Sequence, residues 1–316
     1  MSKRVLMFPG QGSQYIGMGK DFYDNFETAK KVFDKASEIV GFDVAAMCFE
    51  ENDKLNITEY TQICMITVEA AMLSVLKEKG VKFDVTAGLS LGEYAALIAS
   101  GAMSMEDAFE VVRNRGVFMQ NAVPEGGGMT AVIGLTADVI EKICEDVQSA
   151  GSDEEMNNLP FVVSVANYNN PKQSVITGRK DAVKIAGDKC MEAGALKAVE
   201  LNVSGPFHSS LLKGAGEKLS TVLDKVTFND IEIPYLANVN AQYIRDKKDI
   251  KELLVKQVSS SVRWQQSLEN MIAEGVDEFV EVGPGHTLTG FVKKIDRSLK
   301  TVNIETVEDV NNFLGE

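Results

Sequence analysis

The chain has 316 residues, of which 45% are hydrophobic and 25% charged, and its formal net charge at pH 7 is −14. These values are typical of a globular protein with a sizeable core, larger than one small domain needs. The acidic balance argues against nucleic acid as a partner. Because no apolar run approaches the roughly 20 residues of a membrane span and no leader-like segment is apparent, we expect a cytoplasmic protein without membrane association.

The cysteine and histidine content is low, and neither residue type is clustered. None of the cysteines forms a Cys-x-x-Cys pair, and only two histidines are present. We therefore expect reduced, mostly buried thiols, no metal site and no cofactor. The cysteines are Cys48, Cys64, Cys144 and Cys190.

The first 125 residues alternate strand-like and helix-like segments, as a parallel sheet requires. A first strand is expected over Arg4 to Met7, followed by the glycine-rich loop Phe8-Pro9-Gly10-Gln11-Gly12. Such a loop can bind nucleotide phosphates, but Gly-x-Gly-x-x-Gly and a Walker-type ending are both absent. This loop could instead supply a backbone hydrogen-bond donor to a site, and that alternative stays open.

The most informative segment is the Gly-x-Ser-x-Gly pattern Gly88-Leu89-Ser90-Leu91-Gly92. A strand is expected before it, over Phe83 to Ala87, and a helix after it, over Leu91 to Ala99. Glycines two before and two after the serine allow a tight turn that exposes the hydroxyl beside amides able to hold an oxyanion. We therefore predict that Ser90 is a nucleophile. The alternative, a serine near a helix N-cap, leaves both glycines unexplained.

The middle of the chain predicts a second, smaller domain. We expect Gly126-Gly127-Gly128 to be a break, a turn at 168–172 and an exposed polar loop over 149–158. The elements between them, in the order β-α-β-β-α-β, are typical of a ferredoxin-like fold. We expect this domain to span 129–203 and to be inserted into a large α/β domain made of 1–128 and 204–316. The expected elements are strand 129–135, helix 137–147, strands 161–167 and 173–178, helix 181–192 and strand 196–203.

A nucleophilic serine needs a positioned base, which is most often histidine. His286 follows a Gly/Pro turn, where a residue usually makes only local hydrogen bonds. His208 lies where a strand runs into a Gly-Pro turn and a helix opens, which is where α/β folds display catalytic groups. We therefore predict His208 as the base. Because it follows directly after the small domain, we expect the active site in the cleft between the two domains.

Several further segments, in the same order and over almost the whole chain, resemble the malonyl-CoA:acyl carrier protein transacylases of bacterial fatty acid synthesis. Any one segment could match by chance, whereas the full set in order could hardly do so. The segments are Phe8 to Gln14, Gly88 to Leu97, Arg113 to Gln120, Val123 to Gly126, Val203 to Ser209, Ala237 to Ala241, Leu254 to Gln257, Val262 to Trp264 and Glu281 to Gly285.

The resemblance implies an α/β-hydrolase-like large domain with the inserted ferredoxin-like domain, and it implies roles for the site residues. Ser90 would take the malonyl group from CoA, with His208 as its base. A main-chain carbonyl at or near Gln257, and not a buried aspartate, would orient the histidine. The amides of Leu91 and Gln11 would form the oxyanion hole, as the position after an elbow serine and a second loop allow.

The substrate side of the site is implied in the same way. Arg115 would bind the malonyl carboxylate with two parallel hydrogen bonds, for which its planar fork is suited. Arg113 points to another face of the expected helix 106–122, and we expect it to be solvated. Asn167, at the end of the expected strand 161–167, is carried over as a further substrate contact, and Gln11, Arg115 and Gln257 are expected to line the large-domain side of the cleft. Phe207, beside the histidine, fills the space that a branched acyl unit would need. The family usually has histidine at the position of Leu89, so this chain lacks a polar group there.

The implied reaction is ping-pong transfer of malonyl from malonyl-CoA to the thiol of holo acyl carrier protein, through malonyl-Ser90 and by a protein expected to be a monomer. Two other classes stay open at this stage: a serine hydrolase that uses the same elbow, and a non-catalytic scaffold that binds the carrier protein. Carrier proteins are usually acidic, so docking needs a basic patch on this acidic chain. The candidates are Lys293, Lys294, Arg297 and Lys300, or Arg179 and Lys180.

Overall fold

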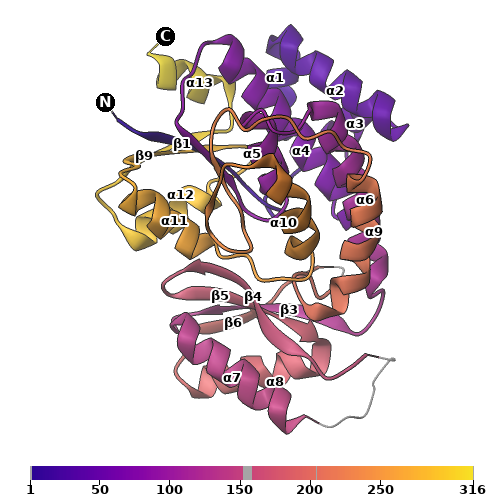
Figure 1. Cartoon of the computed structure of the whole chain (residues 1–316), viewed down its shortest axis with the longest axis vertical. Helices are drawn as coiled ribbons and strands as arrows, with labels where there is room; N and C mark the ends of the chain where they lie inside the picture. Colours follow the sequence, from indigo (N-terminus) through magenta and orange to yellow (C-terminus); the bar gives the residue numbers. More distant parts are fainter. Residues whose placement is uncertain (1, 152–158, 204, 316) are drawn as a thin grey trace.

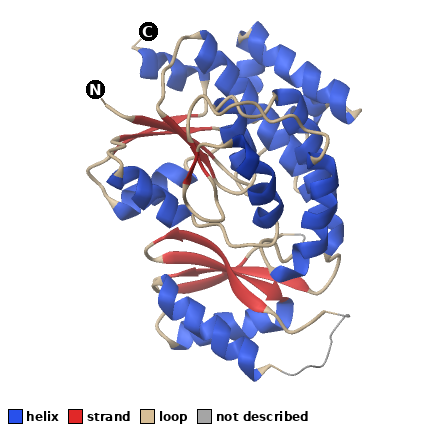
Figure 2. Cartoon of the chain, viewed as in Figure 1, coloured by secondary structure: helices blue, strands red, loops and turns tan. Residues whose placement is uncertain are grey.

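The computed structural model describes residues 2–151, 159–203 and 205–315. It is an α/β fold with two separate sheets, which lie in the upper and lower parts of the molecule (Figures 1 and 2). Segments from the beginning and the end of the chain build the larger sheet, whereas the smaller sheet comes entirely from the middle.

The larger sheet has six strands in the order β10-β9-β1-β2-β7-β8. All neighbouring pairs are parallel except β7 and β8. Because β1, β2 and β9 are buried along most of their length, their apolar side chains form the core on both faces. The strands are β1 Arg4–Phe8, β2 Val85–Gly88, β7 Tyr235–Leu236, β8 Tyr243–Ile244, β9 Glu278–Val282 and β10 Lys300–Ile304.

The helices around this sheet include α4, which is buried over most of its length and packs against α2 and α6. Within the described residues, none of the helices is long and apolar enough to span a membrane. The helices are α1 Lys20–Asn25, α2 Glu27–Val40, α3 Val44–Phe49, α4 Thr58–Glu78, α5 Gly92–Ala99, α6 Met105–Ala122, α9 Lys213–Leu223, α10 Ile250–Gln257, α11 Trp264–Ala273, α12 Thr287–Ile295 and α13 Val307–Leu314, with short 3₁₀ turns at Ser210–Leu212 and Lys247–Asp249.

The smaller sheet is antiparallel, with the strand order β4-β5-β3-β6, and α7 and α8 pack against it (Figure 1). Its elements follow one another in the predicted β-α-β-β-α-β order. They are β3 Gly127–Ile133, α7 Ala137–Ala150, β4 Val163–Asn170, β5 Gln173–Arg179, α8 Lys180–Glu192 and β6 Lys197–Glu200.

Two local predictions in this region are wrong, and a third can be compared only at its start. The glycine run does not break the chain, because Gly127 and Gly128 begin β3 and pair with β5. Gly127 lacks a side chain where Pro206 packs closely, since a Cβ on Gly127 would lie 2.3 Å from the ring of Pro206. The turn predicted over 168–172 is shorter, because β4 continues to Asn170. The polar segment from 149 begins inside α7; its residues 152–158, like residue 204 where we expected the large domain to resume, lie outside the described residues.

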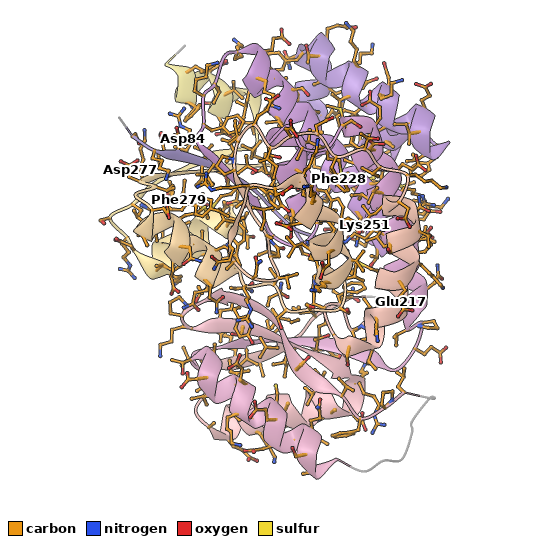
Figure 3. All side chains as sticks on the ribbon, viewed as in Figure 1. Asp84, Glu217, Phe228, Lys251, Asp277 and Phe279 are labelled. Carbon is orange, nitrogen blue, oxygen red and sulfur yellow. The ribbon has the colours of Figure 1, made fainter. Side chains whose placement is uncertain are left out.

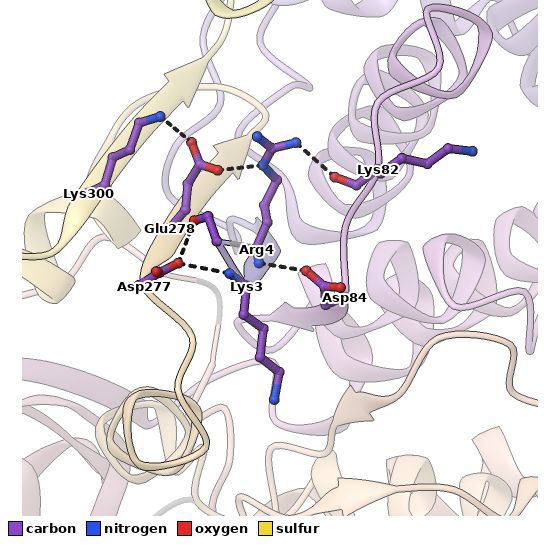
Figure 4. Close-up of polar contacts among 8 residues, drawn as sticks. Lys3, Arg4, Lys82, Asp84, Asp277, Glu278 and Lys300 are labelled. Atoms are coloured by element: carbon purple, nitrogen blue, oxygen red, sulfur yellow. Dashed lines mark hydrogen bonds and ion pairs between the residues drawn. The ribbon is translucent and has the colours of Figure 1, made fainter.

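The N-terminal edge of the larger sheet is held by charged contacts (Figure 4). Glu278 at the start of β9 accepts a hydrogen bond from Arg4 Nε at 2.8 Å and pairs with Lys300 Nζ at 2.6 Å. Asp84 and Asp277, labelled near the start of β1 in Figure 3, accept from the backbone amides of Arg4 and Lys3. This edge is opposite to the carboxyl ends of the strands, where parallel sheets place their ligand sites.

Candidate active site

The Gly-x-Ser-x-Gly segment forms the predicted tight turn between β2 and α5. Ser90 has φ 54°, a left-handed conformation that is uncommon for a residue with a side chain. A Cβ on Gly88 would lie 2.0 Å from the carbonyl of Gly92, and a Cβ on Gly92 would lie 2.1 Å from the carbonyl oxygen of Phe8. Both glycines are therefore required by close backbone approach. The Ser90 amide donates to Asn238 Oδ1 at 2.6 Å, which holds the turn from another loop.

His208 lies beside this serine, with its Nε2 2.7 Å from Ser90 Oγ. Its Nδ1 is 2.8 Å from the backbone oxygen of Gln257, the carbonyl position that the resemblance implies. Since a carbonyl can only accept, Nδ1 carries the proton and Nε2 is free to accept from the serine hydroxyl. Burial and the nearby Arg115 lower the pKa of His208 to about 4, although carbonyl hydrogen bonds oppose the shift. The histidine is thus neutral at pH 7. His286 lies exposed just before α12.

Arg115 brings a positive charge to the same point. Its side chain is 1% exposed, and its Nη2 lies 3.1 Å from Ser90 Oγ. Nη1 donates to Gln62 Oε1 at 2.7 Å and Nη2 to Gln257 Oε1 at 3.0 Å, so two neutral amides hold the guanidinium in place. Among the residues that the structure describes, no carboxylate forms an ion pair with Arg115. A buried cation that no carboxylate of the described residues contacts suits the binding of an anionic group.

The backbone amides of Leu91 and Gln11 are available beside the nucleophile. Both residues line the cavity that contains Ser90. In the part of the chain that the structure describes, neither amide donates to a protein acceptor. Gln11 is fixed by a 3.1 Å hydrogen bond from its side chain to Thr58 Oγ1. Donors of this kind can stabilise a developing oxyanion.

The cavity has a volume of about 290 Å³ and lies between the two sheets. Asn167 lines it from within β4, and not from the strand end where we expected it. Leu89 and Phe207 also line it, so the wall beside the nucleophile is apolar at both positions. Gln257 does not line the cavity, contrary to our expectation. It is completely buried behind Ser90, because its side chain is engaged with Arg115 and the elbow.

Several polar groups around the site were not singled out from the sequence. Gln62, Glu93 and Asn238 are all buried and hydrogen-bonded to the residues described above. Glu93 lies in the segment Gly88 to Leu97 and Asn238 in the segment Ala237 to Ala241, both of which carry the family resemblance. A polar residue among the apolar residues of such a segment was the signal that could have identified them. Gln62 stands alone at the start of an apolar stretch of α4, and nothing in its local pattern indicates its partner.

The charged residues predicted at the surface differ in their surroundings. Arg113 is only partly exposed, contrary to prediction, because it pairs with Glu59 at 3.1 Å and lies over the ring of Tyr60. Arg179 is 4% exposed and forms an ion pair with Asp181, so it is not available for docking. In the other candidate patch, Lys293 binds the carbonyls of Arg297 and Leu299, and Lys300 pairs with Glu278.

The described residues contain no group of three or more histidine, cysteine or acidic side chains that could hold a metal ion. All four cysteines are free and buried. The groups that converge on the cavity are therefore a serine, a neutral histidine, a guanidinium and backbone amides. Together they can perform acyl transfer through a serine ester.

Comparison with known proteins covers almost the whole chain. The family model described as "Acyl transferase domain" matches residues 5–311. The chain is 43% identical over 312 residues to a malonyl CoA-acyl carrier protein transacylase of Bacillus subtilis (strain 168). The alignment covers 98% of this chain and 96% of that protein. It is also similar to the solved structure of an MCAT from Streptococcus pneumoniae, at 42% identity and a TM-score of 0.92 over 99% of both chains. A structure of a malonyl-transacylase in complex with its type II PKS acyl-carrier protein matches at 35% identity and a TM-score of 0.93 over 100% of both chains.

Proposed function

The chain belongs to the acyl transferase domain family, and on this premise we propose that it transfers malonyl from malonyl-CoA to the phosphopantetheine thiol of holo acyl carrier protein. The observation that carries the proposal is the convergence of Ser90, His208 and Arg115 at one point of the cavity. The serine and histidine supply acyl transfer, and the buried guanidinium, which has no carboxylate partner among the described residues, selects an acyl group with a free carboxylate.

In the first half-reaction, Ser90 Oγ attacks the thioester carbonyl while His208 Nε2 takes its proton. The 2.7 Å contact between these atoms allows this transfer directly. The amides of Leu91 and Gln11 hold the oxyanion of the tetrahedral intermediate. When the C–S bond breaks, the CoA thiolate receives the proton from His208, and malonyl-Ser90 remains.

Arg115 holds the malonyl carboxylate through both half-reactions. Its contact with Ser90 Oγ, at 3.1 Å, places the guanidinium close to the acyl group that the serine will carry. Gln62 and Gln257 occupy some of its donors and leave the others for the carboxylate. The arrangement favours malonyl over neutral acyl groups, because a neutral group would leave the charge buried and unpaired.

In the second half-reaction, the thiol of the carrier protein's phosphopantetheine gives its proton to His208 and attacks the malonyl ester. The C–O bond to Ser90 breaks, and Ser90 Oγ recovers the proton from His208. The apolar walls at Leu89 and Phe207 limit the water that could hydrolyse the ester.

The test is the intact mass of the protein after mixing with malonyl-CoA alone, beside the Ser90→Ala variant. We expect a malonyl adduct on the wild-type protein only, and we expect holo carrier protein to discharge it. Free malonate without an adduct or transfer would instead support a hydrolase. Transfer that persists in the Ser90→Ala variant would overturn the role of this serine.

The finer architecture belongs to the same proposal. We propose that 129–203 is a ferredoxin-like domain inserted into an α/β-hydrolase-like domain formed by 1–128 and 204–316. The strand order β4-β5-β3-β6 and the mostly parallel larger sheet support this division. We further propose a cytoplasmic monomer, which the free thiols of the four cysteines support as regards the compartment. Light scattering across a concentration series tests the monomer, since a mass that rises with concentration would contradict it.

A further inference from the structure

The buried carboxyl of Glu93 lies behind the active site, where the mechanism above does not use it. Glu93 is in the first turn of α5, three residues after the nucleophile, and its side chain is 0% exposed. Its Oε2 accepts from Gln257 Nε2 at 2.7 Å and from the Asn238 backbone amide at 3.1 Å. It does not line the substrate cavity. Burying a carboxyl group costs free energy, so the burial of Glu93 at this position calls for an explanation.

The first partner, Gln257, ends α10 and contacts three parts of the site. Its backbone oxygen orients His208 Nδ1 at 2.8 Å. Its side-chain Nε2 also donates to the Ser90 backbone oxygen at 2.8 Å, and its Oε1 accepts from Arg115 at 3.0 Å. The position of this one residue therefore sets the base, the elbow and the guanidinium together.

The second partner, Asn238, holds the elbow from the other side. Its Oδ1 accepts from the Ser90 amide at 2.6 Å, and its Nδ2 donates to the Gly88 carbonyl at 2.7 Å. These two bonds help to fix the left-handed backbone of Ser90, a strained conformation that persists only where the surroundings hold it. Glu93 fixes Asn238 in turn through the Asn238 backbone amide.

We infer that Glu93 is a positioning residue, whose Oε2 holds Gln257 and Asn238 so that Ser90, His208 and Arg115 stay in reacting geometry. The inference rests on the proposed function, because it concerns the same nucleophile and base. Since an error of about 1 Å in a reacting group can cost about 100-fold in rate, loss of this link should act on turnover. Glu93 itself touches neither the acyl group nor the attacking atom.

The test compares variants of Glu93 in the full-length protein. Glu93→Ala removes the acceptor, and Glu93→Met removes it while it fills the volume. Glu93→Gln keeps one oxygen that can accept both bonds. We expect the first two variants to lower kcat for malonyl transfer by about 100-fold and to change KM for malonyl-CoA by less than about threefold. Glu93→Gln should stay within about tenfold of the wild-type kcat.

The matched control is Glu278→Ala. Glu278 is also a buried glutamate that accepts two bonds, but it lies at the N-terminal edge of the sheet (Figure 4). We expect this variant to lose stability but to keep its kcat. If Glu278→Ala and Glu93→Ala lowered kcat equally at a temperature where both are folded, Glu93 would have only a structural role.

A spectroscopic measurement separates positioning from folding. The sequence contains two histidines, so the Nδ1–H resonance of His208 is readily assigned by NMR. We expect it to move in Glu93→Ala and Glu93→Met and to stay in place in Glu93→Gln, while the signals of His286 do not change. Wild-type kcat with an unmoved His208 resonance in both Glu93→Ala and Glu93→Met would overturn the inference.

Labelling of Ser90 by a fluorophosphonate keeps the two proposals apart, because this reagent needs neither malonyl-CoA nor carrier protein. If the wild-type protein is labelled but transfers no malonyl, the proposed function fails. The inference then still depends on whether Glu93→Ala and Glu93→Met are labelled about 100-fold more slowly. Equal labelling rates in wild type and both variants would refute the inference alone.

Discussion

At the scale of single residues, the site contains two buried titratable side chains, Arg115 and His208, that form no ion pair with a carboxylate among the described residues. Arg115 is held by the side-chain oxygens of Gln62 and Gln257, neither of which neutralises it. His208 is kept neutral by burial and by this same guanidinium. Both groups are thus prepared for substrate: the arginine for an anion, and the histidine for a proton.

Arg115→Ala should lower kcat/KM for malonyl transfer by about 10²–10³-fold, because one partner of a buried charge pair is lost. Short neutral acyl groups should be accepted better than by the wild-type protein, since no unpaired guanidinium remains. Competition between malonyl-CoA and acetyl-CoA measures this change. The control is Arg113→Ala, two residues away in α6, which pairs with Glu59 and should keep the malonyl preference. Unchanged preference in Arg115→Ala would remove Arg115 from substrate binding.

The pH dependence of kcat/KM should show the low pKa of His208. The neutral imidazole is the active form, and its pKa of about 4 means that it is protonated only in acid. Between pH 8 and about pH 5, we therefore expect no acid limb from this group. A rapid assay of malonyl-Ser90 formation, with the folded state monitored at each pH, makes the measurement. Half-maximal activity near the ordinary histidine pKa of about 6.5 would contradict the assignment.

At the scale of elements, the turn between β2 and α5 is set by backbone packing. Gly92 in the first turn of α5 faces the carbonyl oxygen of Phe8 at the end of β1. The helix can approach the strand backbone this closely only because Gly92 lacks a side chain. The same approach aims the start of α5 at the cavity and exposes Ser90.

Gly92→Ala should destabilise the protein by about 3 kcal/mol, since an added Cβ would lie 2.1 Å from backbone that cannot move freely. The matched control is Gly290→Ala in α12, where a Cβ meets nothing within 4 Å. That change should stabilise the protein by about 0.5–1 kcal/mol, because alanine favours the helix. Urea unfolding of both variants measures the difference, and similar midpoints would show that the elbow is not tightly packed.

At the scale of the whole molecule, two buried acids from distant parts of the chain, Glu69 and Glu281, lie near each other. Burial raises the pKa of Glu281 at the end of β9, although its hydrogen bonds from the Leu288 and Thr289 amides, at 3.0 and 2.8 Å, oppose the shift. Glu69 of α4 is 0% exposed, and neither of its carboxyl oxygens has a hydrogen-bond partner in the described residues. Burial and the charge of Glu281 raise the pKa of Glu69 well above its usual value.

Glu69→Gln should therefore raise thermal stability at alkaline pH more than at acid pH. Because the pKa is higher in the folded state, the native protein binds more protons, and the wild type loses stability as pH rises above the unfolded value. The variant lacks this loss, so we expect its Tm to exceed that of the wild type by about 2 °C or more at pH 8 and by less at pH 5. Calorimetry at both pH values is the measurement. An equal Tm difference at the two pH values would show that Glu69 does not titrate differently on folding.

For Glu278→Gln we expect the opposite effect on Tm, a decrease at alkaline pH, and this variant serves as the control for the Glu69→Gln experiment. Burial favours its protonated form, but hydrogen bonds from Lys300 and Arg4 outweigh burial and lower the pKa of Glu278. Its contribution to stability is present above the unfolded pKa and is lost in acid. This variant should therefore lower Tm at pH 8 more than it does in acid.

The sequence predicted the larger elements well where short-range patterns decide them. The strand and helix on either side of Ser90 and the order of elements from β3 to β6 follow from local periodicity and turn residues. The family resemblance is confirmed by the match over residues 5–311. The errors fall where tertiary packing overrides a local rule. Gly127 is in a strand because it pairs with Arg179 of β5, and Arg113 is partly buried because it pairs with Glu59 and lies over the ring of Tyr60.

By itself, the sequence predicted Ser90 as nucleophile, His208 as base and Arg115 as substrate contact, because tight turns and recognised segments are local in the chain. Only the tertiary structure decided how these groups are held. The bonds from Gln257 to Glu93 and to the Ser90 carbonyl join residues 164 and 167 positions apart. No local pattern encodes such contacts, since they depend on which buried polar groups meet when α5 and α10 pack together. Each buried donor must then find an acceptor nearby, and here that requirement links the Ser90 turn to Gln257, whose backbone oxygen contacts His208.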